Sequence, residues 1–345
     1  MNRPIDALLT FAEGLNATFR PEGGRGVTLE VSYVISSQMN AFSASDAKCD
    51  AIALTAGLFI RYWQAAQVFD AEEFRAIAWS NPKPSSIPVN PYRLSPTINM
   101  ADIIRDWKDH KVAASQPARW LAFAMTYMIL HHELAHIWLG HTLLIPFDGK
   151  LSEDYPSDID RIVLGQTLEI AADRQAMTAC FQSFVLSNEL TPDFPAMGTG
   201  DMIHNLALSS ALAWELMGRM SRPEPFKFQR GVHPAFYERV YFCAEALKML
   251  SLTYTDLEEK IIEEIIDHAT KVGIYAAAIL TGGGIYNPDL PDLVKLMKEK
   301  FYASAMMSNL IRPNLERFKR GLNVPEIHFG RKRAHWTDHI TASDG

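Results

Sequence analysis

Cysteine is scarce in this chain. Its 345 residues include only Cys49, Cys180 and Cys243, which lie far apart among apolar neighbours. An odd number at such spacing excludes a disulfide framework of the kind found in small secreted domains, and it excludes a zinc site built from cysteine pairs. We therefore expect three buried thiols in a reducing compartment, and a cytoplasmic protein.

Long apolar runs are also missing. No window reaches the roughly 20 uninterrupted apolar residues that a membrane-spanning helix needs. Residues 1–20 contain Asp6 and Glu13 and lack the apolar core of a signal peptide. The longest apolar run, residues 120–130, continues directly into two histidines and a glutamate. The sequence predicts no membrane span.

Basic residues are outnumbered by acidic ones. The chain has 33 Lys and Arg against 40 Asp and Glu, a formal net charge of −7, and one short basic cluster at 331–333. Binding to nucleic acid needs clustered Lys and Arg to neutralise phosphates. We therefore expect no nucleic-acid partner.

The order of the predicted elements indicates an α+β fold that is mostly helical. Alternating residues at 27–36 and a short apolar run at 50–55 predict a small N-terminal β-sheet. A helical pattern follows at 58–69, and the proline-rich stretch at 81–98 cannot form one regular element. Further helices are predicted at 117–140, with Ser115 as the cap, and at about 157–187, 201–220, 234–250, 254–280 and 289–319.

The strongest motif lies on the predicted helix at 117–140. It reads His-Glu-Leu-Ala-His from His132 to His136. On a helix the two histidines are one turn apart on the same face, so both imidazoles can reach one metal ion. Glu133 then stands beside a metal-bound water, whose pKa zinc lowers to about 7, and can act as its general base. The alternative is an ordinary buried helix with two satisfied histidines, but uncoordinated ionisable groups would destabilise so apolar a helix.

A catalytic zinc ion takes three protein ligands, so a third is expected downstream. Glu169 and Asp173 lie one turn apart on the next predicted helix, between apolar neighbours that a solvated acidic face would not have. Glu169 is predicted to complete the zinc site, and Asp173 to accept the free N–H of a ligand histidine. Of the other histidines, His131 points about 100° away from His132 and is expected to be structural. His141 is predicted either to line the cleft or to lie at the surface.

Five segments in order make residues 27–245 similar to one known family. They are Asn40-Ala41-Phe42, the turn Thr55-Ala56-Gly57-Leu58, the His132–His136 motif with a trailing Gly140-His141, Glu169-Ile170-Ala171-Ala172-Asp173-Arg174, and His233-Pro234 followed by Arg239. This series resembles gluzincin-type zinc metallopeptidases of the HtpX/CAAX-prenyl-endopeptidase group. Membrane-bound members have transmembrane helices, so a soluble relative is expected. The Lit-type phage-exclusion peptidases, which cut a translation factor, are one such model.

The resemblance implies roles for the remaining segments. It predicts a zincin-like catalytic core in which the strand at Asn40, Ala41 and Phe42 pairs with an extended substrate. His233 would stabilise the oxyanion of the tetrahedral intermediate, and Arg239 would anchor its helix or an acidic partner in the site. The predicted metallopeptidase domain covers residues 1–250 with an insertion at about 81–116. Residues 251–345 would form a helical region packed on it.

Two functions of different classes follow from these motifs. The first is a zinc-dependent endopeptidase that hydrolyses peptide bonds of a protein or peptide substrate by metal-activated water. The second is a catalytically silent sensor or interaction protein that keeps the zincin scaffold, for example in phage defence or stress regulation. The presence of Glu133 favours the first, because a binding-only scaffold has no use for a general base.

Overall fold

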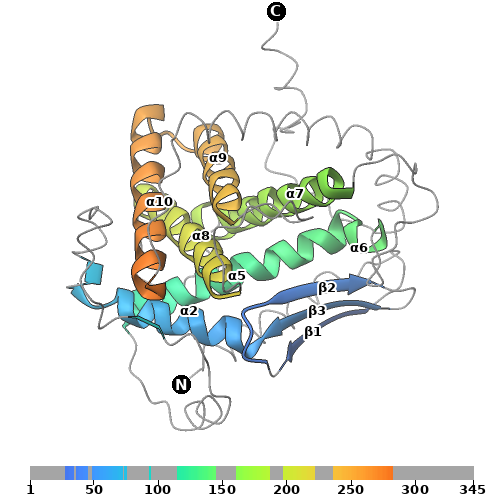
Figure 1. Ribbon diagram of the computed structural model, residues 1–345. Helices are drawn as coiled ribbons and strands as arrows, with labels where there is room; N and C mark the ends of the chain where they lie inside the picture. The colour runs from blue at the N-terminus through green and yellow to red at the C-terminus, as the bar shows by residue number, and fades with distance from the viewer. Residues whose placement is uncertain are drawn as a thin grey trace, which may run out of the picture.

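The structure of this chain is a computed structural model, which describes residues 28–34, 36–45, 49–72, 74–75, 93–94, 115–144, 161–186, 197–221 and 236–282. These residues form a mostly helical fold with a small three-stranded sheet (Figure 1). The strands are β1 (Thr28–Val34), β2 (Ala41–Ser45) and β3 (Cys49–Thr55). The helices are α2 (Ala56–Phe69), α5 (Gln116–Trp138), α6 (His141–Leu144), α7 (Arg161–Phe181), the π-helical turn η2 (Gln182–Leu186), α8 (Thr199–Ser221), α9 (Phe236–Tyr254) and α10 (Glu259–Thr281).

The sheet has β3 at its centre. β3 pairs in parallel with β1 and antiparallel with β2, so the spatial order is β1-β3-β2. Ile52, Ala53 and Leu54 of β3 are buried, as expected of the strand that has a neighbour on each side. Strand β2 runs beneath α5 (Figure 1). Within the described residues, β2 has one paired edge and lies at the border of the sheet.

A tight turn joins β3 to α2. The Thr55 hydroxyl accepts a hydrogen bond from the Leu58 N–H and donates to the carbonyl oxygens of Gln38 and Asn40. At Gly57 any Cβ would collide with the backbone of residues 37 and 38, so only glycine fits there. The turn therefore fixes the start of β2 against the end of β3.

Helix α5 is the central element of the fold. Ser115 caps it by accepting a hydrogen bond from the Ala118 N–H, as the sequence predicts. The helix contacts α2, α7, α8 and β2, and most of its side chains are buried. It ends before Gly140, whose φ of 78° places it in the left-handed region that glycine adopts without strain. A helix covered on nearly all sides holds its polar side chains inside the protein.

Helices α8, α9 and α10 complete the core. Helix α10 packs on α8 and α9, and its buried residues belong to the same hydrophobic core as those of α5. The predicted helix at 254–280 begins later, at Glu259, and residues 289–319 lie outside the described residues. So does most of the predicted insertion at 81–116. The division at residue 250 stays a prediction.

Two further expectations concern cysteines and membranes. None of the three cysteines forms a disulfide, and Cys180 and Cys243 are buried as expected, whereas Cys49 is only half-buried. No helix in the described part of the chain has the length and apolarity needed to cross a membrane.

The crossing of α8 and α10 gives a test of the packing. A Cβ added at Gly273 would lie 2.7 Å from the Ala211 Cβ and 3.0 Å from the Leu208 carbonyl oxygen. Gly273→Ala should therefore lower the free energy of unfolding by about 1–2 kcal/mol, because overpacking outweighs the gain in helix propensity. Gly200→Ala, with its nearest neighbour at 3.4 Å, is the control and should change stability little. Denaturant unfolding of both variants measures the difference, and a stabilised Gly273 variant would contradict this packing.

Candidate metal centre

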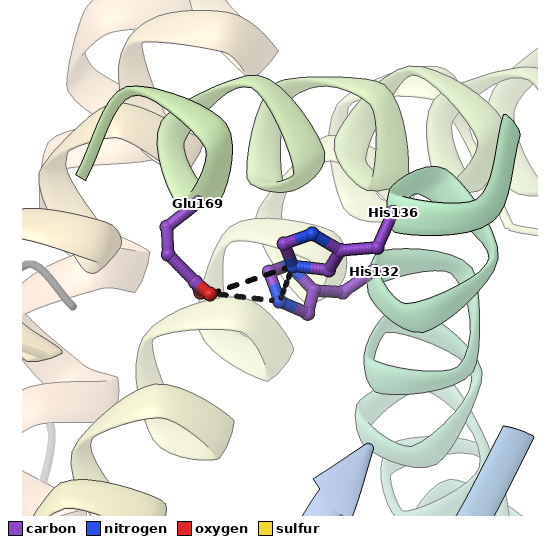
Figure 2. Close-up of side chains that lie close together, drawn as sticks. All are labelled: His132, His136 and Glu169. Carbon is purple, nitrogen blue, oxygen red and sulfur yellow. Dashed lines mark hydrogen bonds and ion pairs between the residues drawn. The ribbon is translucent and has the colours of Figure 1, made fainter. Parts of the chain in front are cut away.

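Three side chains from α5 and α7 converge inside the protein. His132 and His136 project from α5, and Glu169 projects toward them from α7 (Figure 2). The Nε2 atoms of the two histidines are 3.0 Å apart. Carboxylate oxygens of Glu169 lie 3.4 Å from the Nε2 of His132 and 3.5 Å from that of His136.

These separations fit a single bound metal ion. Ligand atoms about 2.0–2.1 Å from a tetrahedral zinc ion are about 3.3–3.4 Å from one another. The three separations in the protein, 3.0, 3.4 and 3.5 Å, cluster around that value. The predicted ligands His132, His136 and Glu169 therefore form a group, the ligand group, that could hold a metal ion.

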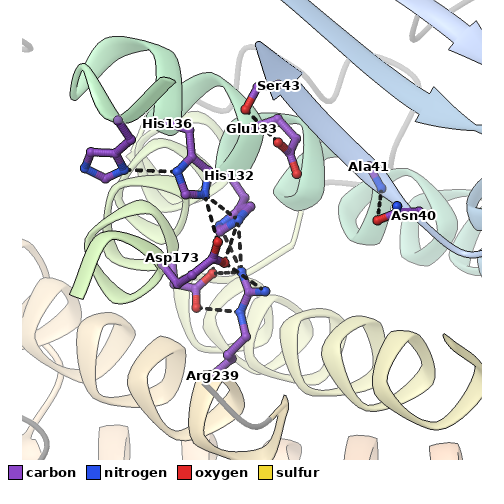
Figure 3. Close-up of polar contacts among 10 residues, drawn as sticks. Asn40, Ala41, Ser43, His132, Glu133, His136, Asp173 and Arg239 are labelled. Carbon is purple, nitrogen blue, oxygen red and sulfur yellow. Dashed lines mark hydrogen bonds and ion pairs between the residues drawn. The ribbon is translucent and has the colours of Figure 1, made fainter. Parts of the chain in front are cut away.

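Asp173, the predicted partner of a ligand histidine, is in contact with His132. An oxygen of Asp173 lies 2.9 Å from the Nδ1 of His132, on the opposite side of the ring from the ligand group. Arg239 reaches the same carboxylate from α9, donating to its two oxygens at 2.8 and 2.6 Å (Figure 3). Asp173 therefore holds the orientation of His132, and Arg239 holds Asp173.

Trp214 on α8 is a neighbour that sequence reasoning missed. The Arg239 guanidinium carbon lies 3.4 Å from the centre of the Trp214 ring, a cation–π contact, and the His132 ring packs edge-on against the same indole at 5.3 Å. One Arg239 amino group is 3.0 Å from both ring nitrogens of His132, so it lies against the imidazole rather than pointing at one nitrogen. Nothing in the local sequence distinguishes Trp214 from a core residue.

The site holds more buried negative than positive charge. Glu133, Glu169 and Asp173 are buried carboxyl groups, whereas Arg239 is the one buried cationic side chain among these contacts. If all are ionised and the histidines are neutral, three carboxylates against one guanidinium leave two negative charges in excess. Buried charge of this kind is costly unless it is paired or coordinates a metal. A divalent cation would balance it.

Without a metal, protonation of His132 supplies part of that balance. Burial and the Arg239 charge lower the pKa of His132, but the Asp173 and Glu169 carboxylates outweigh them and raise it to about 9. Burial lowers the pKa of His136 to about 3. The two pKa shifts have opposite signs because His132 faces the Asp173 carboxylate directly, whereas burial dominates at His136. A bound metal ion would replace the proton of His132.

Glu133 lies next to the ligand group and contacts the sheet. Its side chain is buried, and the Ser43 hydroxyl on β2 donates to its Oε2 at 2.8 Å (Figure 3). Burial raises the pKa of Glu133, although the His132 charge and the Ser43 hydrogen bond oppose this shift. A carboxylate with a raised pKa beside a metal site suits a general base. Ser43 directly follows the predicted Asn-Ala-Phe segment but was not itself predicted.

His141 lies inside the protein, which resolves the alternative left open by the sequence. It is 3% exposed, and its Nδ1 is 3.0 Å from the Nδ1 of His136. His131 is also buried and packs on the Tyr127 ring at 4.4 Å. Burial lowers the pKa of His131 to about 3, which agrees with the structural role predicted for it.

Of the predicted residues on and before β2, Asn40 and Ala41 lie apart from the two histidines (Figure 3). Asn40 precedes β2, and its side-chain oxygen accepts from the Ala41 N–H (Figure 3). Ala41 is buried, whereas Phe42 is 40% exposed. His233 lies outside the described residues.

Comparison with protein-family models, with curated proteins and with solved structures finds no match to this chain.

Metal binding should release a proton near neutral pH. With a pKa of about 9, His132 carries the proton at pH 7, and a metal ion that takes its Nε2 must displace that proton. Binding of Zn²⁺ should therefore release about one proton per ion at pH 7, and the affinity should rise with pH until about pH 9. Calorimetry in buffers of different ionisation enthalpy measures the release. Binding with no proton released would show that His132 is already neutral.

Proposed function

We propose that this protein is a zinc-dependent endopeptidase with Glu133 as its general base. The observation that supports this most is the convergence of His132, His136 and Glu169, with the buried carboxyl group of Glu133 directly after His132 in α5. The other two parts of the proposal are a zincin-like core and membership of a soluble branch of the gluzincin group. They rest on the order of the motifs in the sequence.

The donor set supports zinc over other metals. Two imidazoles and one carboxylate are the ligands of a known class of catalytic zinc sites, which keep a fourth position open for water or substrate. Magnesium and calcium prefer sites made of oxygen ligands. When bound, zinc would activate water as a nucleophile at neutral pH and polarise a substrate carbonyl.

The protein's own residues would hold the ion and move the proton. Asp173 fixes the orientation of His132, and Arg239 fixes Asp173. Glu133 would accept a proton from the attacking water and deliver it to the leaving amine. Its raised pKa brings it closer to neutral pH, where a base can both take and return a proton.

Strand β2 is the element best suited to hold the substrate. It lies at the border of the described sheet and carries Ser43, which contacts Glu133. An extended peptide that paired with the edge of β2 facing away from β3 would pass beside Glu133, the proposed general base. The segment Asn40, Ala41 and Phe42 is proposed to take part in this pairing. A role for His233 as the oxyanion-binding residue remains a proposal carried by the sequence resemblance.

We further propose that the protein acts in the cytoplasm on protein or peptide substrates. The absence of disulfides among the three cysteines is compatible with a reducing compartment.

The conservative variant Glu133→Gln tests the proposed base. It removes the proton acceptor and keeps the size of the side chain, so zinc should still bind at one ion per chain. Cleavage should fall by about 10²–10⁴-fold. Zinc is quantified by mass spectrometry, and cleavage is measured by N-terminal profiling of a cell extract treated with the protein. Glu264→Gln, an exposed position on α10, is the control.

Two outcomes would contradict the proposal. Cleavage at the wild-type rate by the Glu133 variant would rule out its role as base. Zinc bound by the wild-type protein with no cleavage across the extract would favour the catalytically silent scaffold instead.

Loss of the Ser43 hydroxyl should slow the reaction without removing the metal. In Ser43→Ala the carboxylate of Glu133 loses a hydrogen bond that orients it, while the three proposed ligands keep theirs. We expect cleavage to fall by about tenfold, because a hydrogen bond to a charged group contributes about 1.5 kcal/mol. Ser32→Ala on β1, an exposed position, is the matched control. Zinc loss from the Ser43 variant would mean that the contact supports the fold of the site instead.

A further inference from the structure

We propose that His141 is a positioning residue that fixes the tautomer of His136 and so prepares it to bind the metal ion. This inference rests on the proposed metal centre and adds a third histidine to it. The sequence alone left His141 between the cleft and the surface.

A short reversal of the chain brings His141 to His136. Helix α5 ends at Trp138, and Gly140 adopts a φ of 78° before α6 begins at His141. The reversal folds α6 back on the end of α5. The Nδ1 atoms of the two histidines then lie 3.0 Å apart, with ring centres at 5.0 Å and an interplanar angle of 69°. His141 is buried, so water does not compete freely for this contact.

The second nitrogen of the His136 ring, Nε2, determines which histidine donates in this hydrogen bond. A hydrogen bond between two neutral imidazoles needs an N–H on one nitrogen and a lone pair on the other. The Nε2 of His136 faces His132 and Glu169 and must present its lone pair to a metal ion. The proton of His136 therefore sits on Nδ1 and is donated to His141. The Nδ1 of His141 accepts, which leaves the proton of His141 on its Nε2.

The same contact keeps His136 from adopting the wrong tautomer. With its proton on Nε2, His136 would direct an N–H at the ion and could not bind it. Its Nδ1 lone pair would then face the Nδ1 of His141, which would have to become the donor. Only the arrangement in which the Nδ1 of His141 accepts leaves the Nε2 lone pair of His136 available to the ion. Ligand histidines commonly depend on such a partner.

The two proposed histidine ligands thus have partners of different charge. His132 faces the carboxylate of Asp173, whereas His136 faces a neutral ring. The site already contains an excess of buried carboxylates over guanidinium groups. A neutral acceptor at His136 supplies the required hydrogen bond without adding a further negative charge. This accounts for a histidine, rather than an aspartate, at position 141.

A pair of variants of similar shape separates the hydrogen bond from packing. In His141→Asn the amide oxygen can stand where Nδ1 stood, whereas in His141→Leu a methyl group of similar size replaces it. We expect the dissociation constant for Zn²⁺ to rise by about 10–100-fold in the Leu variant and to stay within about threefold of wild type in the Asn variant. Competition with a chromophoric chelator measures it. Equal affinity of the Leu variant and wild type would overturn the inference, as would equal losses in both variants.

A second measurement on the wild-type protein does not depend on how the variants fold. Long-range proton–nitrogen NMR spectra of the zinc-loaded protein report which ring nitrogen of each histidine carries the proton. We expect His136 protonated at Nδ1 and His141 at Nε2. A proton on the Nδ1 of His141 would overturn the inference. Failure of the wild-type protein to bind zinc would instead reject the metal centre itself, so the two failures are distinguishable.

Discussion

The buried ion pair between Asp173 and Arg239 is the interaction on which the arrangement of the site depends. It joins α7 to α9 by two hydrogen bonds, with Asp173 fully buried. Removing either partner of such a pair typically costs 3–5 kcal/mol, because the charge left behind has no solvent. The pair holds Asp173 against His132, and Glu169 lies one turn away on the same helix face. Asp173 is therefore the partner of the proposed ligand His132. Its anchored position on α7 also sets where the proposed ligand Glu169 lies.

The sheet and the reversal between α5 and α6 provide polar partners for side chains of α5. Strand β2 brings Ser43 to Glu133, and α6 brings His141 to His136, so these two polar side chains of α5 each have a partner from another element. In an apolar interior, such contacts cost little further ordering when a ligand arrives, since the side chains already occupy the required positions. The turn fixed by Thr55 and Gly57 has the same effect on β2, because it anchors the beginning of that strand.

Local spacing allowed much of the site to be predicted from the sequence. The separation of four residues places His132 with His136, and Glu169 with Asp173, on one helix face each, and the cap at Ser115 fixes where α5 begins. The contacts of Ser43, His141 and Trp214 could not be predicted, because they depend on how β2, α6 and α8 approach α5. Strands β1 and β3 are separated in the sequence by β2 but pair directly in the sheet, and this parallel pairing is set by tertiary packing rather than by alternation along each strand.

Zinc K-edge X-ray absorption of the purified protein reports the atoms that bind the ion. We expect one zinc ion per chain in a four-coordinate site of nitrogen and oxygen donors at about 2.0–2.1 Å, with the multiple scattering of two imidazoles. Absence of zinc after loading would contradict the proposed metal centre. So would a spectrum dominated by sulfur at about 2.3 Å, since the two buried cysteines would then be the ligands instead of His132, His136 and Glu169.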